Sequence, residues 1–122
     1  MPTEYDSPLA RKLNLKSGMR VRVLAKPADV DLTGLSTTDA VDADGIIVFV
    51  RTLADVDAGS EPVLDAARLD HIVWLVYPKA GQLGTDLNRD ILWRHMLEKG
   101  VQGVRQIAID DIWSALRFRV QR

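Results

Sequence analysis

The chain has 122 residues, of which 47% are apolar and none is cysteine, and its formal net charge is −1. This length fits one domain over residues 1–122, with a core that forms without disulfides, and the apolar fraction excludes a disordered chain. The lack of cysteine also excludes thiolate nucleophiles and thiolate metal sites. No signal peptide or long apolar run is recognisable, so we expect a cytoplasmic protein without a membrane-spanning segment.

The charges are unevenly distributed along the chain. Residues 27–70 contain ten acidic and two basic side chains, a net charge of −8. Residues 1–26 contain six basic and two acidic side chains, and residues 71–122 contain eight and five, giving +4 and +3. Proteins that bind nucleic acids usually present a strongly basic face. Two weakly basic segments around an acidic one therefore argue against nucleic acid as a partner.

The first half of the chain predicts one short helix and three strands after a loose tail over residues 1–7. Ser7 and Pro8 suit the N-cap and first position of a helix over 8–15. Residues 19–25 alternate apolar and basic side chains, which predicts a strand with one solvent-exposed face. A weak edge strand is predicted over 36–41. "GIIVFV" (45–50) is a continuous apolar run, typical of a strand buried on both faces.

Two helices and a buried strand are predicted next. Residues 53–69 predict a helix that Gly59 interrupts, with Ser60 as a second N-cap. "HIVWLVY" (71–77) predicts another fully buried strand. Residues 86–99 predict a helix that Thr85 or Asp86 would cap and that Gly100 would end.

The last two predicted strands, over 104–109 and 113–120, are joined by a tight turn at Asp110 and Asp111. This turn is too short for a crossover connection, so the last strand must be antiparallel to its neighbour. The earlier strands alternate with helices, which predicts parallel pairing with both sheet faces covered. We therefore predict a small α/β, three-layer, Rossmann-like domain with a mostly parallel sheet of five or six strands, the last strand being antiparallel.

Three cations follow predicted parallel strands. Lys26 and Arg51 come directly after the first strand and "GIIVFV", and Lys79 comes two residues after "HIVWLVY". Ligands of open α/β sheets bind outside the carboxyl ends of the strands. This pattern predicts a phosphate or carboxylate site at that rim. The alternative is that these charges are only solvated, or are paired with Asp110 and Asp111.

Arg89 heads an apolar helical stripe that includes Leu92, Trp93 and Met96. This spacing predicts a guanidinium that points toward the sheet and requires an anionic partner. An internal salt bridge is favoured over a ligand contact. The candidate carboxylates within the chain are those of Asp86, Asp90, Asp110 and Asp111.

Other chemical signatures are sparse. His71 and His95 lack the spacing of metal ligands, so no metal site is predicted. "AKPADV", after the first strand, has no glycine that would let the backbone approach a pyrophosphate or an adenosyl group. We therefore expect no dinucleotide or S-adenosylmethionine cofactor. Trp113, beside the Asp110 turn, is the tryptophan best placed to contact a ligand.

Four blocks, "SPLARKLNLKSGMRVRVL", "IIVFV", "WLVYPKAGQLGTDLNRD" and "QIAIDDIWSALRF", resemble a bacterial family known as domain of unknown function 3052. The resemblance covers nearly the whole chain and implies a set of signature residues but no activity. The signature residues are Tyr77, Pro78, Lys79, Asp86, Arg89, Asp90, Asp111, Trp113, Ser114 and Arg117. The layout also resembles, more remotely, the later half of class I methyltransferases, which end in a similarly reversed strand.

Our leading hypothesis is a non-catalytic or regulatory binding module for a small anion or a protein partner. Its candidate ligand-binding residues are Lys26, Arg51, Lys79, Arg89, Asp111 and Trp113. One alternative is a degenerate methyltransferase-like or nucleotide-dependent enzyme that uses Asp110 or Asp111 as a base beside Lys79. The other is a purely structural subunit, working as a homodimer or with a partner chain.

Overall fold

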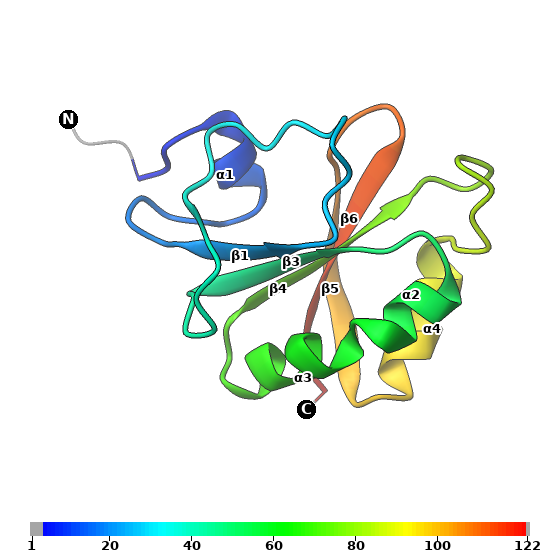
Figure 1. Cartoon of the computed structure of the whole chain (residues 1–122). Helices are drawn as coiled ribbons and strands as arrows, with labels where there is room; N and C mark the ends of the chain where they lie inside the picture. Colours follow the sequence, from blue (N-terminus) through cyan, green and yellow to red (C-terminus); the bar gives the residue numbers. More distant parts are fainter. Residues whose placement is uncertain (1–3, 122) are drawn as a thin grey trace.

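The computed structural model describes residues 4–121, which contain one six-stranded sheet (Figure 1). Its strands are β1 (Val21–Leu24), β2 (Thr37–Thr38), β3 (Gly45–Phe49), β4 (Ile72–Pro78), β5 (Val101–Ala108) and β6 (Trp113–Val120). Their order across the sheet is β2-β1-β3-β4-β6-β5. The pairs β2–β1, β1–β3 and β3–β4 are parallel, whereas β6 is antiparallel to both β4 and β5. The predicted α/β fold with a reversed last strand is confirmed.

The helices lie on both faces of the sheet. Figure 1 shows α1 (Pro8–Lys12) on one face, and α2 (Leu53–Ala58), α3 (Ser60–Arg68) and α4 (Arg89–Leu97) on the other. Every residue of β3 and β4 is buried, as the continuous apolar runs predict. Successive side chains of a strand point to opposite faces, so these strands contribute to two separate cores. No helix within residues 4–121 is long and apolar enough to cross a membrane.

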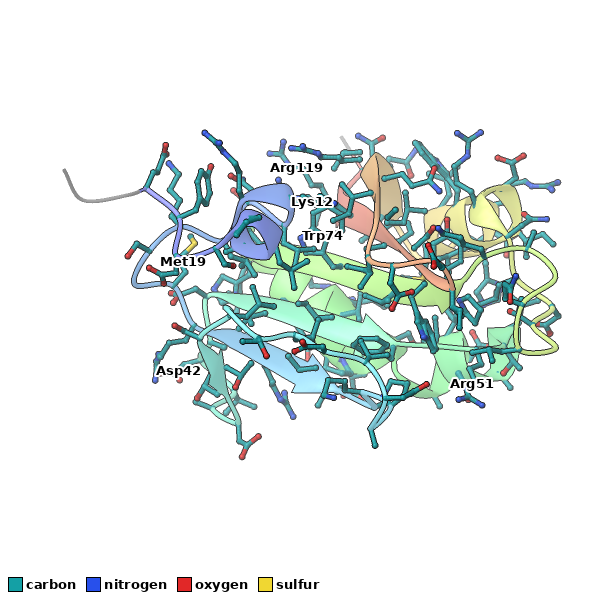
Figure 2. All side chains as sticks on the ribbon, turned by 90° about the horizontal axis from the view of Figure 1, so that it is seen from above. Lys12, Met19, Asp42, Arg51, Trp74 and Arg119 are labelled. Carbon is teal, nitrogen blue, oxygen red and sulfur yellow. The ribbon has the colours of Figure 1, made fainter. Side chains whose placement is uncertain are left out.

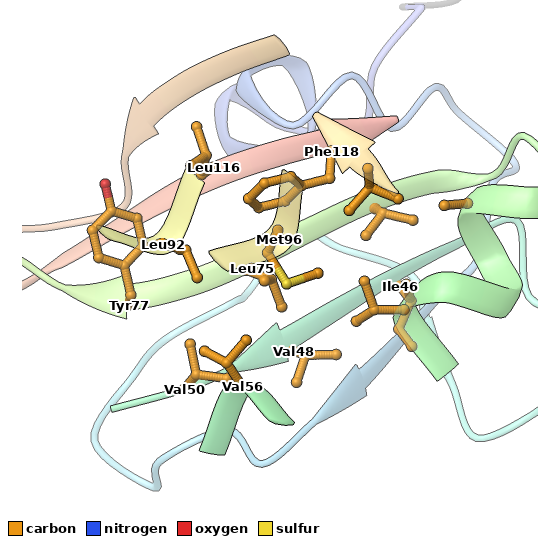
Figure 3. Close-up of a cluster of buried hydrophobic side chains, with 14 of the residues drawn as sticks. Ile46, Val48, Val50, Val56, Leu75, Tyr77, Leu92, Met96, Leu116 and Phe118 are labelled. Atoms are coloured by element: carbon orange, nitrogen blue, oxygen red, sulfur yellow. The ribbon is translucent and has the colours of Figure 1, made fainter. Parts of the chain in front are cut away.

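The larger core lies between the sheet and the three helices α2, α3 and α4 (Figure 3). Leu75 and Leu116 contribute to it from β4 and β6, and Leu92 and Met96 contribute from α4. The two α4 side chains are fully buried. The apolar positions of this helix therefore face the sheet as their spacing predicts.

The smaller core lies under α1 and the loop that follows β1. Trp74 of β4 is fully buried there, and its Nε1 donates a hydrogen bond of 2.9 Å to the carbonyl oxygen of Leu13 (Figure 2). Ser7 caps α1 as predicted, through a 3.0 Å bond from the amide of Ala10. The expected loose tail is wrong for residues 4–7, because Tyr5 donates to Asn14 at 3.1 Å; residues 1–3 lie outside the described part.

The helix expected over 86–99 begins later, at Arg89. Asn88 caps it, because its Oδ1 accepts the amide hydrogen of Ile91 at 2.9 Å. The caps predicted at Thr85 and Asp86 are wrong. Both side chains instead hold the loop before α4 against the segment after β3, through the bonds described below. Thr85 and Asp86 therefore make tertiary contacts instead of capping the helix.

The helix expected over 53–69 is two helices that meet at Gly59. A Cβ on this glycine would lie 3.2 Å from Cγ1 of Val48, so the junction packs closely on β3. Ser60 is not the N-cap of α3, because it lies inside the helix and its hydroxyl donates to the carbonyl of Asp57 at 2.9 Å. Thr52 caps α2 by accepting the amide hydrogen of Asp55.

An ionic cluster joins α2 to α4. Oδ1 of Asp57 lies 2.7 Å from Nε2 of His95 and 3.0 Å from Nζ of Lys99. The hydrogen bond to His95, followed by that to Lys99, lowers the pKa of the Asp57 carboxyl below its usual 3.8. The cluster therefore favours the ionised carboxylate and ties the two helices together.

This cluster predicts a pH-dependent contribution to stability. A carboxyl whose pKa is lower in the folded state stabilises the fold above its usual pKa, and this stabilisation disappears as the pH falls through the folded-state value. The Asp57→Asn variant should therefore unfold at lower urea concentration than wild type at pH 6, and the difference should shrink below pH 3.8. Urea unfolding from pH 2 to 7 measures this. The control is Asp65→Asn, since Asp65 pairs with Arg68 of its own helix; an equal effect in both variants would contradict the prediction.

Candidate functional site at the carboxyl ends of the strands

A cavity of about 320 Å³ opens at the carboxyl ends of β1 and β3, where the fold predicts a ligand. Its walls come from the two strand ends, from both ends of α2 and from the start of β6. The lining residues are Leu24, Ala25, Pro27, Val48, Phe49, Arg51, Asp55, Ala58, Gly59 and Trp113. Most of them are apolar, and only Arg51 and Asp55 are charged. Such a wall suits a small ligand with an apolar body and one anionic group.

Of the cations predicted to bind a ligand, Arg51 is the one that lines this cavity. Its side chain is exposed, and no carboxylate pairs with it within residues 4–121. Its backbone is fixed on both sides: the amide donates to Oδ2 of Asp55 at 3.0 Å, and the carbonyl accepts the hydroxyl of Thr85. Asp55 therefore serves the start of α2, while the guanidinium is available at the cavity.

The loop between β4 and α4 supports this wall from outside. Asp86 Oδ1 accepts the amide hydrogen of Leu53 at 3.0 Å, and Thr85 contacts the carbonyl of Arg51. Two polar side chains of the loop thus hold the chain between β3 and α2. Asp86 is a candidate cap, signature residue and partner of Arg89 in the sequence, but in the structure it binds a segment 33 residues away, and Arg89 pairs with Asp90.

Ala25, which sequence reasoning did not single out, follows β1 directly, has a φ of +61° and lines the cavity. This left-handed conformation is uncommon for residues other than glycine, asparagine and aspartate. A glycine at this position would let a ligand approach the backbone, whereas the Cβ of Ala25 covers it. Pro27 follows two residues later in the same wall. The alternating pattern of 19–25 contains no signal for this turn.

Lys26 does not reach this cavity. Its ammonium group donates to the carbonyls of Pro27 at 2.9 Å and Val30 at 2.7 Å, so it closes the loop after β1. It lines a separate hollow near Asp31 and Thr33. The rim therefore does not gather Lys26 and Arg51 on one ligand-binding surface.

Lys79 follows β4 at the same rim and is half-buried. Its backbone amide donates to the carbonyl of Ile112 at 2.7 Å, which joins the loop to the turn before β6. In this turn, Oδ1 of Asp110 accepts the amides of Ile112 and Trp113, each at 2.8 Å. Asp110 is therefore a turn residue, and both Asp110 and Asp111 are exposed and lie outside the lining of the cavity.

Trp113 belongs mainly to the smaller core. It is 2% exposed and packs edge-on against Phe49, with ring centroids 5.3 Å apart and an interplanar angle of 74°. One side of it still lines the cavity. It is a rigid apolar wall and not an exposed stacking platform. Ser114 is buried beside it, opposite Tyr77 in the register of β4 and β6.

The expected inward orientation of Arg89 is wrong. Its side chain is 57% exposed and pairs with the neighbouring Asp90 at 3.2 Å, on the surface of α4 next to Arg94. Arg89 is the first residue of α4, and the buried stripe of this helix begins one turn later, at Leu92. Arg89 therefore does not join Arg51 at the cavity.

The ring of Tyr77 belongs to the larger core, and its hydroxyl contacts a polar side chain of β5. Its Oη accepts a hydrogen bond of 3.0 Å from Nε2 of Gln106. Burial raises the pKa of the phenol above 10.0; the charge of Arg89 opposes this shift, and that of Asp90 adds to it. The phenol is therefore protonated at neutral pH and acts as a structural hydrogen-bonding group. The signature residue Arg117 lies on the opposite face of the sheet from Tyr77, as the register partner of Trp74.

No protein-family model and no curated protein sequence matches the chain, so the resemblance to domain of unknown function 3052 stays a prediction. Solved structures do match its fold. A structure of a LepI complex with SAM has a TM-score of 0.53 at 12% identity, and a LepI variant in complex with SAH and a substrate analogue has 0.51 at 13%. A structure described as a pericyclic reaction enzyme also scores 0.51 at 13% identity.

Each match covers 93% of this chain but only 39% of the matched chain, so the protein spans less than half the length of these structures. At such low identity the likeness concerns the fold alone. The six-stranded, mostly parallel sheet with its reversed last strand is a Rossmann-like α/β fold that these structures share.

Proposed function

We propose that the protein is a non-catalytic or regulatory binding module for a small ligand that combines an apolar body with a carboxylate or phosphate group. The observation that carries this proposal is the apolar cavity at the ends of β1 and β3 with the unpaired Arg51 on its wall, within residues 4–121. Its volume of about 320 Å³ is at the lower end of the usual range for small-molecule sites. A guanidinium at the mouth would orient the ligand through paired hydrogen bonds.

Binding without catalysis is favoured by the roles of the polar groups. Asp55 accepts the backbone amide of Arg51, and Asp110 accepts two amides of its own turn. Neither contacts a hydroxyl nucleophile within residues 4–121. A general base needs hydrogen-bond reach to the proton that it removes, and both carboxylates are already used to hold backbone.

The test is a thermal-shift screen with aromatic carboxylates and nucleoside monophosphates, followed by calorimetry on the compound that raises the melting temperature most. The Arg51→Gln variant should bind that compound at least about tenfold more weakly, because it loses a charged hydrogen-bond donor. Arg68→Gln removes the same charge from an exposed site on α3 and should bind like wild type. The absence of any stabilising compound, or equal binding by both variants, would reject the proposal.

S-adenosylmethionine and S-adenosylhomocysteine are a second candidate, because structural neighbours of the fold are described as complexes with SAM or SAH. The residues after β1 do not fit an adenosyl group well: Ala25 and Pro27 line the wall where a glycine loop would be needed. We derive no methyl-transfer step. Calorimetry with both compounds should show no binding to wild type, and micromolar binding of either would replace the proposal by the methyltransferase-like alternative.

A further inference from the structure

Three arginines form a cluster on the α1-side face of β5 and β6, away from the rim. Arg105 of β5 is the register partner of Arg117 of β6, and Arg119 lies two residues further along β6 on the same face. On its other side Arg117 is paired with Trp74 of β4. Figure 2 looks onto this face and labels Trp74 and Arg119 beside α1. We call Arg105, Arg117 and Arg119 the arginine cluster.

The arginine cluster is an unfavourable arrangement for the protein alone. Like charges directly opposite each other on neighbouring strands are destabilising. Arg117 is half-buried, and its Nε is fully buried without a hydrogen-bond partner within residues 4–121. Burial lowers the pKa of Arg117, and the charges of Arg119 and Arg105 lower it further. A buried donor without an acceptor costs free energy and calls for an explanation such as an ion that binds there.

The chain supplies little negative charge to this face. Asp70 lies 3.9 Å from Arg119, and its side chain is 72% exposed. Asp110 accepts hydrogen bonds from its own turn at the far end of β6. Within residues 4–121 no carboxylate forms an ion pair with Arg105 or Arg117. The arginine cluster therefore keeps an excess of positive charge that the fold does not neutralise.

We propose that the arginine cluster binds a multiply charged oxyanion of the phosphate type, at a site distinct from the rim cavity. Neighbouring residues on one face of an antiparallel pair are about 5 Å apart, and residues two apart on a strand are roughly 7 Å apart. Long guanidinium side chains at these spacings can converge on one phosphate or pyrophosphate. Each planar guanidinium can donate two parallel hydrogen bonds to its oxygens. The bound anion supplies an acceptor for Arg117 and offsets the repulsion between strands.

The test follows the Nε–H signal of Arg117 in ¹⁵N-labelled full-length protein while inorganic pyrophosphate is added. This signal should shift and saturate. Arg105→Gln and Arg119→Gln should each weaken binding by about tenfold, because each removes a charged donor. Asp70→Asn should tighten binding, because it removes the carboxylate that competes for Arg119. The melting temperature of Arg105→Gln should be no lower than that of wild type, because the substitution removes a like-charge pair. Weaker binding by this variant would then not be caused by misfolding.

Two matched variants separate this site from other charges. Arg94→Gln makes the same charge change on the exposed surface of α4 and should leave pyrophosphate binding unchanged. Arg51→Gln should also leave it unchanged, so this proposal and the rim proposal can fail independently. A silent Arg117 signal, or an equal loss in Arg94→Gln and Arg105→Gln, would overturn the inference. A phosphoserine peptide that binds more tightly than pyrophosphate would assign the phosphate to a partner protein, and weaker peptide binding would assign it to a free small molecule.

Discussion

Replacing Trp74 by alanine is expected to lower the free energy of unfolding by about 3–5 kcal/mol, the usual cost of deleting a buried tryptophan. Trp74 lies on β4 at the centre of the sheet and is fully buried. Its Nε1 bond to the Leu13 carbonyl joins β4 to the end of α1 across 61 residues of sequence. Alanine would leave a cavity under α1 and a buried carbonyl without its donor. Urea unfolding followed by far-ultraviolet circular dichroism measures the loss.

Trp74→Phe is the matched control, because it retains most of the apolar ring and removes only the donor. Its cost should be about 1–3 kcal/mol, the penalty for leaving a buried acceptor unsatisfied plus a small packing loss. A well-packed core is expected to distinguish the two variants clearly. Equal losses of unfolding free energy in the two variants would show that α1 repacks on the sheet without the aromatic ring. Such a result would contradict the role assigned to Trp74.

Replacing Gly103 by alanine is expected to cost about 1–3 kcal/mol, even though alanine normally restricts the unfolded chain and so favours folding. A Cβ at Gly103 would lie 2.8 to 3.0 Å from ring atoms of Trp93 on α4. The glycine stands beside the irregularity in the β5–β6 pairing between Gly103 and Arg105. The alanine must therefore displace α4 or distort the strand, and chemical denaturation measures the effect.

A double-mutant cycle with Trp93→Leu tests the cause. If the indole ring opposes the new methyl group, the cost of Gly103→Ala should be much smaller in the Trp93→Leu background, giving a coupling free energy of about 0.5–3 kcal/mol. Gly103→Ala that costs the same in both backgrounds would instead indicate a purely backbone effect at the bulge. The cycle therefore separates side-chain packing from local strand geometry.

Much of the fold follows from local patterns. The apolar runs of β3 and β4 correctly predict strands buried on both faces, because residues covered from both sides cannot alternate with polar ones. The short turn at Asp110 and Asp111 correctly predicts a reversed β6, because a crossover needs many more residues. Ser7 was also recognised as a cap, since its bond is made within one turn of chain.

The position of β6 between β4 and β5 is not encoded in any one segment. Strand order depends on which edges pair after the helices have packed, and the turn alone allows β6 on either side of β5. The same limit applies to Arg89. Helical periodicity predicts that it lies on the inward stripe. In the structure Asn88 caps the helix, so Arg89 is its first residue, and the guanidinium is exposed beside Asp90.

The loop from Tyr77 to Asp90 shows what each level of information contributes. Its sequence alone determined that a buried strand ends at Tyr77, one residue before the observed end of β4, and that a helix follows. Hydrophobic periodicity and turn residues act over a few neighbours, so they can be recognised locally. Only the tertiary structure decided that Thr85 and Asp86 bind the chain after β3, that Lys26 closes its own loop, and that Arg51 alone of the four predicted cations lines the cavity. Side-chain direction at a strand end depends on hydrogen bonds to distant backbone, and these form only when the sheet has brought the segments together.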